Sequence, residues 1–384
     1  MSVIPGIERF VAHPPGESIG VRLGLLTNPS GIDRQLRSSV DIIAQHPDLD
    51  LVALYGPEHG VRGDAQAGEH VSSSVDQATG LPVFSLYDDA TNSQPDDPLD
   101  TIDVLLFDIQ DIGVRYATYL STLDNVLEAC AEHDVRVIVL DRPNPLGGTI
   151  VAGNMLEPTF RSFVGTHSIP VMHGLTMGEF ARLWARDHGK PEPLVVSMEG
   201  WNREMWFDQT GLQWVLPSPN LPTLDSVALY PATCLIEGTT LSEGRGTARP
   251  FELIGAPRIE PTRLAAELTS LGIAGVDFRP VFFTPTFSKH QGERCAGVQI
   301  YLQSRGALDA VALGPVLLAT IKKLYPDQFC WLPPRGDEFF IDKLAGSSAL
   351  RLTVDQEASL SELLHQWALD SARFVGERSD ILLY

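Results

Sequence analysis

Apolar and polar positions alternate in blocks along the first half of the chain. Runs of nearly continuous Val, Ile and Leu predict buried strands within residues 19–31, 50–56, 81–87, 101–111 and 135–148. Residues 119–134 place five apolar side chains on one helical stripe, namely Leu120, Leu123, Val126, Leu127 and Cys130. A further helix is predicted over residues 33–47, with Asp33 as its N-cap. Apolar strands separated by helices are typical of a parallel sheet covered on both faces, so we predict a Rossmann-like, doubly wound α/β domain.

The second half has a looser pattern. Residues 154–176 show no clear period, whereas helices are predicted over residues 176–189, 261–272, 309–325 and 359–375. The first of these helices begins with Thr176 and Glu179, which have the spacing of a capping box. Residues 278–303 are predicted to be extended. Because 384 residues exceed one ordinary core, we predict a catalytic domain over residues 1–249 and a smaller α+β auxiliary domain over residues 250–384.

Polar side chains follow four of the predicted strands. They are Thr27 and Asn28, then Glu58 and His59, then Asp108, Gln110 and Asp111, and finally Asp141, Arg142 and Asn144. Ligands of doubly wound sheets bind beyond the carboxyl ends of the strands, where these residues are expected to meet. Any one of them could instead cap the next helix. The four groups together predict a binding or catalytic site at this edge.

Charge and composition exclude several partners. The chain has 28 Lys and Arg against 49 Asp and Glu, a formal charge of -21, so we expect neither nucleic acid nor a membrane as a partner. The first 18 residues lack the basic and apolar regions of a signal peptide, and no stretch has the roughly 18 uninterrupted apolar residues of a membrane span. We expect a soluble, cytoplasmic protein, although a processed export precursor would look the same. Exposed apolar surface would allow a homodimer, which nothing in the sequence tests.

Motifs for cofactors and metals are missing from the sequence. No GxGxxG follows the first strand and no glycine–lysine phosphate loop occurs, so we expect no nucleotide cofactor. Histidines stand near acids at His59, His70, His167 and His173, but none has the HExxH or a comparable ligand spacing. We therefore expect no catalytic metal.

Seven strings, in order along the chain, carry a family resemblance. They are "LTNPSG", "LYGPEHGVRG", "LLFDIQDIGVRYATYL", "VLDRPNPLGG", "PSPNLPTLDSVALYPATCLIEGT", "SEGRGT" and "FSKHQGERCAGVQI". Together the strings resemble the exo-β-N-acetylmuramidase (NamZ-type) family over roughly residues 20–380. Two positions depart from the family pattern. Thr240 stands where the family usually has Asn, and Met172 stands where a basic residue is more typical. The resemblance implies a glycoside hydrolase that removes N-acetylmuramic acid from the non-reducing ends of peptidoglycan fragments, with a Rossmann-like domain and a smaller auxiliary one.

Glycosidic cleavage usually needs one carboxylic acid to protonate the leaving oxygen and a second group as base or nucleophile. We predict Glu58 as the acid, because it follows a Gly-Pro turn that ends a buried strand and so starts from a rigid, partly desolvated position. His59 could orient Glu58 or be a structural imidazole. The candidates for the second group are Glu237, Asp108, Asp111, Glu243 and Glu69. Glu237 repeats the pattern of Glu58, since its apolar run also ends in an acid at a glycine.

A muramic acid residue differs from glucosamine by a lactyl carboxylate, so its pocket should contain a cation. The arginines in the matching strings are Arg62, Arg115, Arg142, Arg245 and Arg249, and one guanidinium fork is expected to bind this group while others pair with acids. Sugar hydroxyl and acetamido groups could be bound by Asn28, Gln110, Asn144, Asn220 and His290, with Asp108, Asp111, Asp141 and Glu243 as further polar contacts. Tyr116 and Tyr119 could stack on a pyranose ring or belong to the core.

Two other classes of function fit parts of this pattern. A non-catalytic carbohydrate-binding protein with a two-domain cleft would need the hydrogen-bonding groups but no carboxyl able to donate a proton. An esterase or amidase of the α/β-hydrolase class would need a GxSxG nucleophile elbow, which the sequence lacks. The sequence therefore favours a glycosidase, with a binding protein as the alternative.

Overall fold

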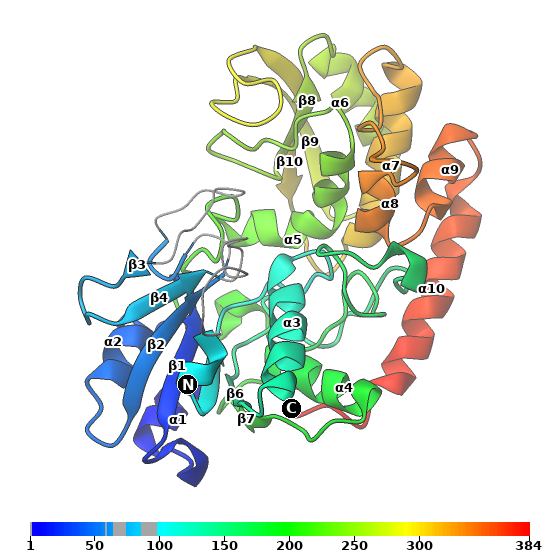
Figure 1. Ribbon diagram of the computed structural model, residues 1–384. Coiled ribbons are helices and arrows are strands. Elements are labelled where there is room, and N and C mark those ends of the chain that lie inside the picture. Colours follow the sequence, from blue (N-terminus) through cyan, green and yellow to red (C-terminus); the bar gives the residue numbers. More distant parts are fainter. Residues whose placement is uncertain (1, 58–59, 64–73, 86–97) are drawn as a thin grey trace.

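The computed structural model describes residues 2–57, 60–63, 74–85 and 98–384. Its first part is a seven-stranded sheet in the order β3-β4-β2-β1-β5-β6-β7 (Figure 1). The strands are β1 (Arg22–Thr27), β2 (Asp50–Gly56), β3 (Ser74–Val75), β4 (Pro82–Ser85), β5 (Val104–Asp108), β6 (Arg136–Leu140) and β7 (Leu194–Val196). The pairs are parallel except β3–β4, so the predicted mainly parallel α/β sheet is confirmed. The short strands β3 and β7 were not predicted.

The strand order locates a binding edge. Without β3, the six parallel strands lie in the order third, second, first, fourth, fifth and sixth along the chain, which is the order of a doubly wound dinucleotide-binding fold. The direction of winding reverses between β1 and β5. In such sheets the crevice that binds ligands opens at the carboxyl ends of the strands on either side of this reversal. The loops after Thr27 and Asp108 are therefore the expected walls of a site.

The central strands are apolar throughout because both faces of the sheet are covered. Val104 and Leu106 of β5 belong to one core, and Leu105 and Phe107 belong to the opposite core. One face is covered by α1 (Gly6–Ala12) and α2 (Ser39–Ala44), and the other by α3 (Thr118–Glu132) and α4 (Met177–His188). Successive side chains of a strand point to opposite faces, which explains the unbroken apolar runs.

The predicted start of the second helix is wrong. Helix α2 begins after Ser38, whose hydroxyl accepts a hydrogen bond from the Val40 amide at 3.3 Å. Asp33 instead accepts from the amides of Gln35 and Arg37, at 2.9 and 2.8 Å, and so closes a turn of its own. Asp side chains favour both arrangements, and here the turn forms. The capping box of Thr176 and Glu179 at the start of α4 is confirmed.

The second part is a three-stranded antiparallel sheet covered by helices. Its strands are β8 (Leu253–Ala256), β9 (Val276–Phe283) and β10 (Cys295–Leu302), in the order β8-β10-β9. Its helices are α5 (Leu224–Thr233), α6 (Pro261–Ser270), α7 (Ala310–Leu324), α8 (Phe340–Ala345), α9 (Ala349–Asp355) and α10 (Leu360–Glu377). Short 3-10 helices are η1 (Gly16–Ser18), η3 (Pro98–Thr101), η4 (Pro158–Phe160), η5 (Phe207–Gln209) and η6 (Cys234–Gly238). The predicted smaller α+β unit is therefore present, and the boundary predicted between residues 249 and 250 stays a prediction.

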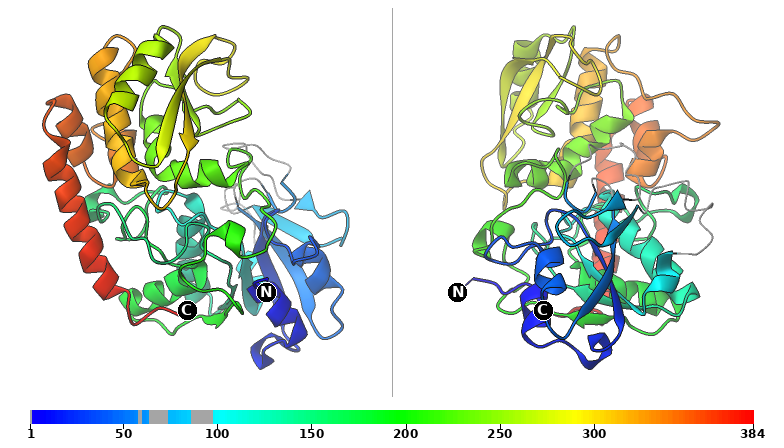
Figure 2. Two further views of the ribbon diagram at one scale, coloured as in Figure 1. Left: turned by 180° about the vertical axis from the view of Figure 1, so that it is seen from behind. Right: turned by 60° about the vertical axis from the view of Figure 1, so that its left-hand side comes forward.

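Helix α10 ties the two parts together (Figure 2). Its Leu363 and Trp367 belong to the core of the second part, and Phe374 belongs to a core of the first sheet. Beyond the helix, the hydroxyl of Tyr384 donates to Asp141 Oδ2 at 2.8 Å, at the end of β6. Side chains of α10 therefore pack in cores of both parts, and Figure 1 shows the helix running alongside both.

Candidate active site

A cavity of about 250 Å³ lies where the loop after β5 meets α5 and η6. Its lining is mixed, with aromatic, hydroxyl, amide and charged side chains. The lining includes Tyr116, Thr118, Tyr119, Phe163, Ser218, Asn220, Tyr230, Cys234, Glu237, Arg245 and Phe251. Residues 116–119 follow β5, so the cavity lies at the carboxyl end of that strand. This is the side of the strand reversal at which the fold predicts a ligand.

Glu237 is the carboxylate of this cavity. Helix α5 continues directly into η6, which carries Glu237 and ends at Gly238. Only glycine fits at position 238, because a Cβ there would lie 2.7 Å from Cβ of Ile341. The Glu237 side chain keeps 19% of its surface exposed, and its Oε1 accepts from Arg245 Nη2 at 2.7 Å. The acid followed by glycine in the sequence therefore forms a short 3-10 turn that packs against α8. The carboxylate of this turn, Glu237, lines the cavity.

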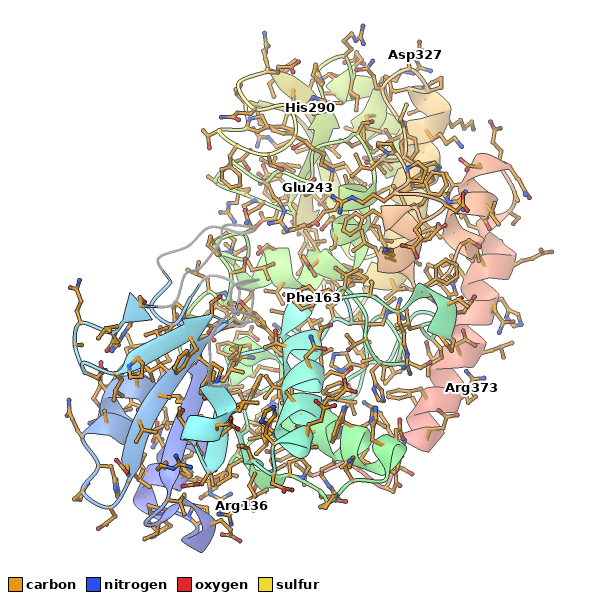
Figure 3. The ribbon with its side chains drawn as sticks, viewed as in Figure 1. Arg136, Phe163, Glu243, His290, Asp327 and Arg373 are labelled. Atoms are coloured by element: carbon orange, nitrogen blue, oxygen red, sulfur yellow. The ribbon has the colours of Figure 1, made fainter. Side chains whose placement is uncertain are left out.

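Two cations and two carboxylates alternate around this turn. Arg245 Nε lies 3.4 Å from Glu243 Oε1, and Lys289 Nζ lies 2.8 Å from Glu243 Oε2. Lys289 also donates to the carbonyls of Ile236 and Thr239 at 3.0 and 2.9 Å. The buried Glu243 carboxylate therefore positions the Arg245 guanidinium by an ion pair, and hydrogen bonds from Lys289 hold the backbone on both sides of Glu237. Figure 3 labels Glu243 in the second part of the molecule, above Phe163.

The protonation of Glu237 is tuned by this surrounding. Burial raises the pKa of the Glu237 carboxyl above its ordinary value, the Arg245 cation opposes the rise, and the Glu243 carboxylate adds to it. The pKa is therefore raised on balance, which shifts it toward neutral pH. Carboxyls with raised pKa values in a cavity are common among groups that transfer protons or attack a substrate.

Aromatic rings form one wall of the cavity. The ring centroids of Tyr116 and Tyr230 are 5.7 Å apart, and those of Tyr230 and Phe251 are 4.7 Å apart. The Arg245 guanidinium lies 5.1 Å from the Phe251 ring centroid. Phe251 has a left-handed φ of 64°, and its amide donates to the Glu243 carbonyl at 2.7 Å. The strained backbone of Phe251 thus keeps its ring beneath the guanidinium.

Asn28 connects the end of β1 to the cavity. Its Nδ2 donates to the Pro217 carbonyl at 3.3 Å, and its Oδ1 accepts from the Ser30 amide at 2.9 Å. Pro217 also accepts a hydrogen bond from the Tyr119 hydroxyl, and Ser218 and Asn220 line the cavity. The loop after β1 and the start of α3, which follows β5, therefore both contact Pro217, next to the lining residue Ser218. Among the predicted substrate contacts, Asn220 and Arg245 line the cavity and Asn28 supports it.

Arg115 lies behind the cavity and is bound to the backbone. Its guanidinium donates to the carbonyls of Asn154, Ile169 and Ala345 at 2.7, 2.8 and 2.8 Å. The side chain is 1% exposed. These bonds join the first part of the chain to α8, so the observed contacts of Arg115 are those of a scaffold residue.

Several other predicted residues also bond to the scaffold at the sheet edge. Gln110 Nε2 donates to the carbonyls of Asp111 and Pro143, each at 2.7 Å, and Asn144 Nδ2 donates to that of Leu175 at 2.9 Å. Asp141 accepts from Thr176 and Gly178, and burial raises its pKa to about 6. These contacts join strand ends to the neighbouring loops and to the start of α4.

Asp111, Arg62, Arg249 and His290 likewise have partners within the protein. Burial raises the pKa of Asp111 to about 6, and its Oδ2 accepts from the Gly113 amide at 2.7 Å. Arg62 pairs with Asp76 and Asp41 at 2.9 and 2.8 Å, and Arg249 pairs with Glu252 at 3.3 Å. His290 Nε2 lies 2.8 Å from the Thr240 carbonyl. Their roles in binding substrate stay predictions.

Asp108 and Arg142 form a buried ion pair beneath the edge. Arg142 Nε and Nη2 lie 2.5 and 2.8 Å from Asp108 Oδ1 and Oδ2, and the Ser39 hydroxyl also donates to Asp108. Their side chains are 0% and 5% exposed, respectively. A buried charge whose partner is removed typically costs about 3–5 kcal/mol, so we expect Arg142→Met to lower the free energy of unfolding by about that amount.

Thermal and urea unfolding would measure this loss. Arg22→Met is the matched control, because Arg22 pairs with Asp103 in an exposed bidentate contact on β1 and should change stability far less. An Arg142→Met protein with unchanged stability but weakened sugar binding would return this pair to the list of substrate contacts.

Glu58 and His59 lie outside the residues that the structure describes, as do Glu69 and His70. The nearby described residues locate the end of β2. Gly60 donates to the Pro57 carbonyl at 3.0 Å. Position 63 needs glycine, because a Cβ there would lie 2.5 Å from Pro29 Cγ. Gly63 thus packs on Pro29 in the loop after β1, and Asn28 of that loop contacts the cavity lining.

Several residues of the site were not predicted from the sequence, among them Thr118, Phe163 and Ser218 of the lining. Lys289, Tyr230, Cys234 and Phe251 lie in or beside strings quoted for the resemblance, but none had a local signal for a role. Lys289 immediately precedes His290, and it becomes significant only because β9 and β10 bring its loop to η6. Within the described ranges, no group of three His, Cys, Asp or Glu is placed to hold a metal ion. In the same ranges, no helix is both long and apolar enough to cross a membrane.

Comparison with known proteins supports one family over nearly the whole chain. Residues 23–225 match the family model described as "Exo-beta-N-acetylmuramidase NamZ, N-terminal", and residues 228–384 match its C-terminal counterpart. The chain is 47% identical over 380 residues to the peptidoglycan beta-N-acetylmuramidase NamZ of Bacillus subtilis (strain 168), which covers 99% of this chain and 91% of the relative.

Two crystal structures of DUF1343 family proteins from Bacteroides fragilis NCTC 9343 share the fold. The first has a TM-score of 0.89 at 36% identity, and covers 100% of this chain and 99% of its own. The second has a TM-score of 0.73 at 26% identity with the same coverage. The arrangement of both parts is therefore shared with solved relatives.

Proposed function

Because this chain belongs to the exo-β-N-acetylmuramidase NamZ family, we propose that it is a glycoside hydrolase that releases N-acetylmuramic acid from the non-reducing end of peptidoglycan fragments. The observation that carries the proposal is the carboxylate of Glu237 beside Arg245 in a cavity of about 250 Å³. This volume of about 250 Å³ lies just below the roughly 300–1,000 Å³ typical of ligand sites, and suits one sugar residue rather than a chain. An enzyme that removes terminal residues requires such a pocket.

The two carboxyl groups have different roles in this proposal. Glu58 donates a proton to the leaving oxygen, and Glu237 acts from the other side of the sugar as base or nucleophile. The packing of Gly63 on Pro29, and the bond from Asn28 to Pro217, support a position for the end of β2 near the cavity. His59 orients Glu58. Two carboxyl groups suffice for glycosidic hydrolysis, so the proposal requires no cofactor.

Arg245 is the cation assigned to the lactyl carboxylate. It is the arginine, among the five predicted ones, that lines the cavity. Its Nη2 and Nε face Glu237 and Glu243, and no hydrogen bond between the described residues uses its Nη1. A guanidinium has five N–H donors, so it can hold two protein carboxylates and still donate to a third. Arg245 would thereby select muramic acid and also influence the charge on Glu237.

Chromogenic substrates test this function. We expect release of the chromophore from a β-N-acetylmuramide and none from the matching β-N-acetylglucosaminide, because the glucosaminide lacks the carboxylate that Arg245 binds. Cleavage of the glucosaminide alone would contradict the role of the lactyl group. Saturable binding of the muramide without release would favour the alternative of a carbohydrate-binding protein. A cytoplasmic location and a homodimer stay predictions from the sequence.

A further inference from the structure

A second, larger hollow adjoins the cavity. It has a volume of about 590 Å³, and Phe163 and Val164 line both spaces. The opposite wall comes from residues 332–343, which include Leu332, Arg335 and Phe340. We call this hollow the 335 groove. Phe163, which lines both spaces, is labelled in Figure 3.

The wall of the 335 groove is attached to the turn that carries Glu237. The Leu332 amide donates to the Gly238 carbonyl at 2.9 Å, and the Thr240 amide donates to the Cys330 carbonyl at 2.9 Å. Ile341 of α8 packs so closely on Gly238 that a Cβ there would lie 2.7 Å away. Glu237 lines the smaller cavity, and the backbone of the turn that carries it is therefore hydrogen-bonded to the wall of the larger groove.

The lining of the 335 groove has the chemistry of a site for an acidic sugar chain. Phe163, which is 38% exposed, and the half-buried Phe340 offer apolar surface of the kind on which pyranose rings pack. Arg335 and Lys343 supply two cations against the single carboxylate of Glu338, which pairs with Lys343 at 2.6 Å. The lining therefore carries one more cation than carboxylate, although the chain as a whole has a formal charge of -21. Within the described part of the chain, no carboxylate lies within ion-pair distance of the Arg335 guanidinium.

We propose that the 335 groove binds the leaving-group side of the substrate, namely an amino-sugar chain that bears a peptide with free carboxylates. This inference rests on the proposed function, because it takes the sugar in the cavity to be the one that is released. The next sugar then lies at Phe163 and Phe340, and the peptide carboxylates reach Arg335. Arg335 is a specificity-determining residue for long fragments and takes no part in bond cleavage.

The affinity of the protein for the leaving product tests directly whether the 335 groove binds it. The probe is an N-acetylglucosaminyl-N-acetylmuramyl tripeptide, titrated into the full chain by calorimetry in its free-acid form and in a form with amidated carboxylates. We expect Arg335→Gln to weaken binding of the acid form by about fivefold and to leave the amidated form unchanged, because one charge-assisted hydrogen bond is lost. Lys190→Gln is the matched control, since it removes one cation that is also exposed, beyond the end of α4.

Kinetics separate this inference from the function itself. With the aryl muramide, whose leaving group is too small to fill the groove, Arg335→Gln should retain wild-type kcat/KM. With a fragment that carries the acidic peptide, its kcat/KM should fall about fivefold, mainly through KM. A wild-type protein that leaves the aryl muramide intact would contradict the function, whereas the calorimetric comparison would still decide the groove. Equal affinity of wild type and Arg335→Gln for the acid form, or no binding of that form, would overturn the inference.

Discussion

Replacing Glu58 by glutamine is expected to slow hydrolysis of a fragment with a sugar leaving group by several powers of ten, within the roughly 10²- to 10⁴-fold that general acid catalysis contributes. Glutamine keeps the size of the side chain but has no proton to donate to the leaving oxygen. A nitrophenyl leaving group needs little protonation, so the same variant should lose much less activity on the aryl muramide. The measurement is kcat/KM on both substrates, together with the affinity for N-acetylmuramic acid, which should hardly change.

The control for this variant is Glu204→Gln, which neutralises one exposed acid. It should leave both rates at the wild-type level. Full activity of Glu58→Gln on the sugar fragment would remove Glu58 as the acid. An equal loss on both substrates would instead assign it to the other side of the sugar.

Replacing Glu237 by glutamine is the second change with a large expected effect. If Glu237 acts on the sugar rather than on the leaving oxygen, the variant should lose activity by a similar factor of about 10²–10⁴ on both substrates. Glutamine can still accept a hydrogen bond from Arg245, so the fold around η6 should persist. We therefore expect Glu237→Gln to unfold like the wild type and to hydrolyse both substrates more slowly by the same factor.

The pH dependence of an Arg245→Met protein tests the same role. Because the Arg245 cation holds the pKa of Glu237 down against burial, its removal should let that pKa rise further. A base or nucleophile must be ionised, so the acidic limb of the kcat/KM profile should move to higher pH. If the basic limb moved instead, Glu237 would be the acid, and the roles of the two carboxyls would be exchanged. An unchanged profile would contradict any catalytic role for Glu237.

Much of the fold could be predicted because its signals are local. The apolar runs of β1, β2, β5 and β6 and the capping box of α4 each depend on residues within a few positions of one another. The error at α2 has the same local origin, since Asp33 and Ser38 both suit a helix cap and a turn, and the sequence does not rank them. The very short strands β3 and β7 have too few residues for a period to be visible.

The roles of the charged residues in the candidate site could not be predicted from local signals. Arg115 and Arg245 both stand in matching strings beside glycines or aromatic residues, and nothing near them in the sequence separates a scaffold residue from a ligand-facing one. Contacts from distant residues decide it, because Arg115 donates to Ala345, 230 positions away, whereas Arg245 faces a cavity with Glu237. Lys289 gained its role in the same way, through the carbonyls of η6.

The sequence by itself determined β1, β2, β4, β5 and β6, six of the helices, the family likeness and the position of Glu237 before a glycine, because each depends on neighbouring residues or on the order of strings. Only the tertiary structure decided which charged side chains are paired with the scaffold, which of them line a cavity, and that a larger groove adjoins it. The physical reason is that burial and ion pairing are set by side chains that meet after folding, from positions as far as 230 residues apart.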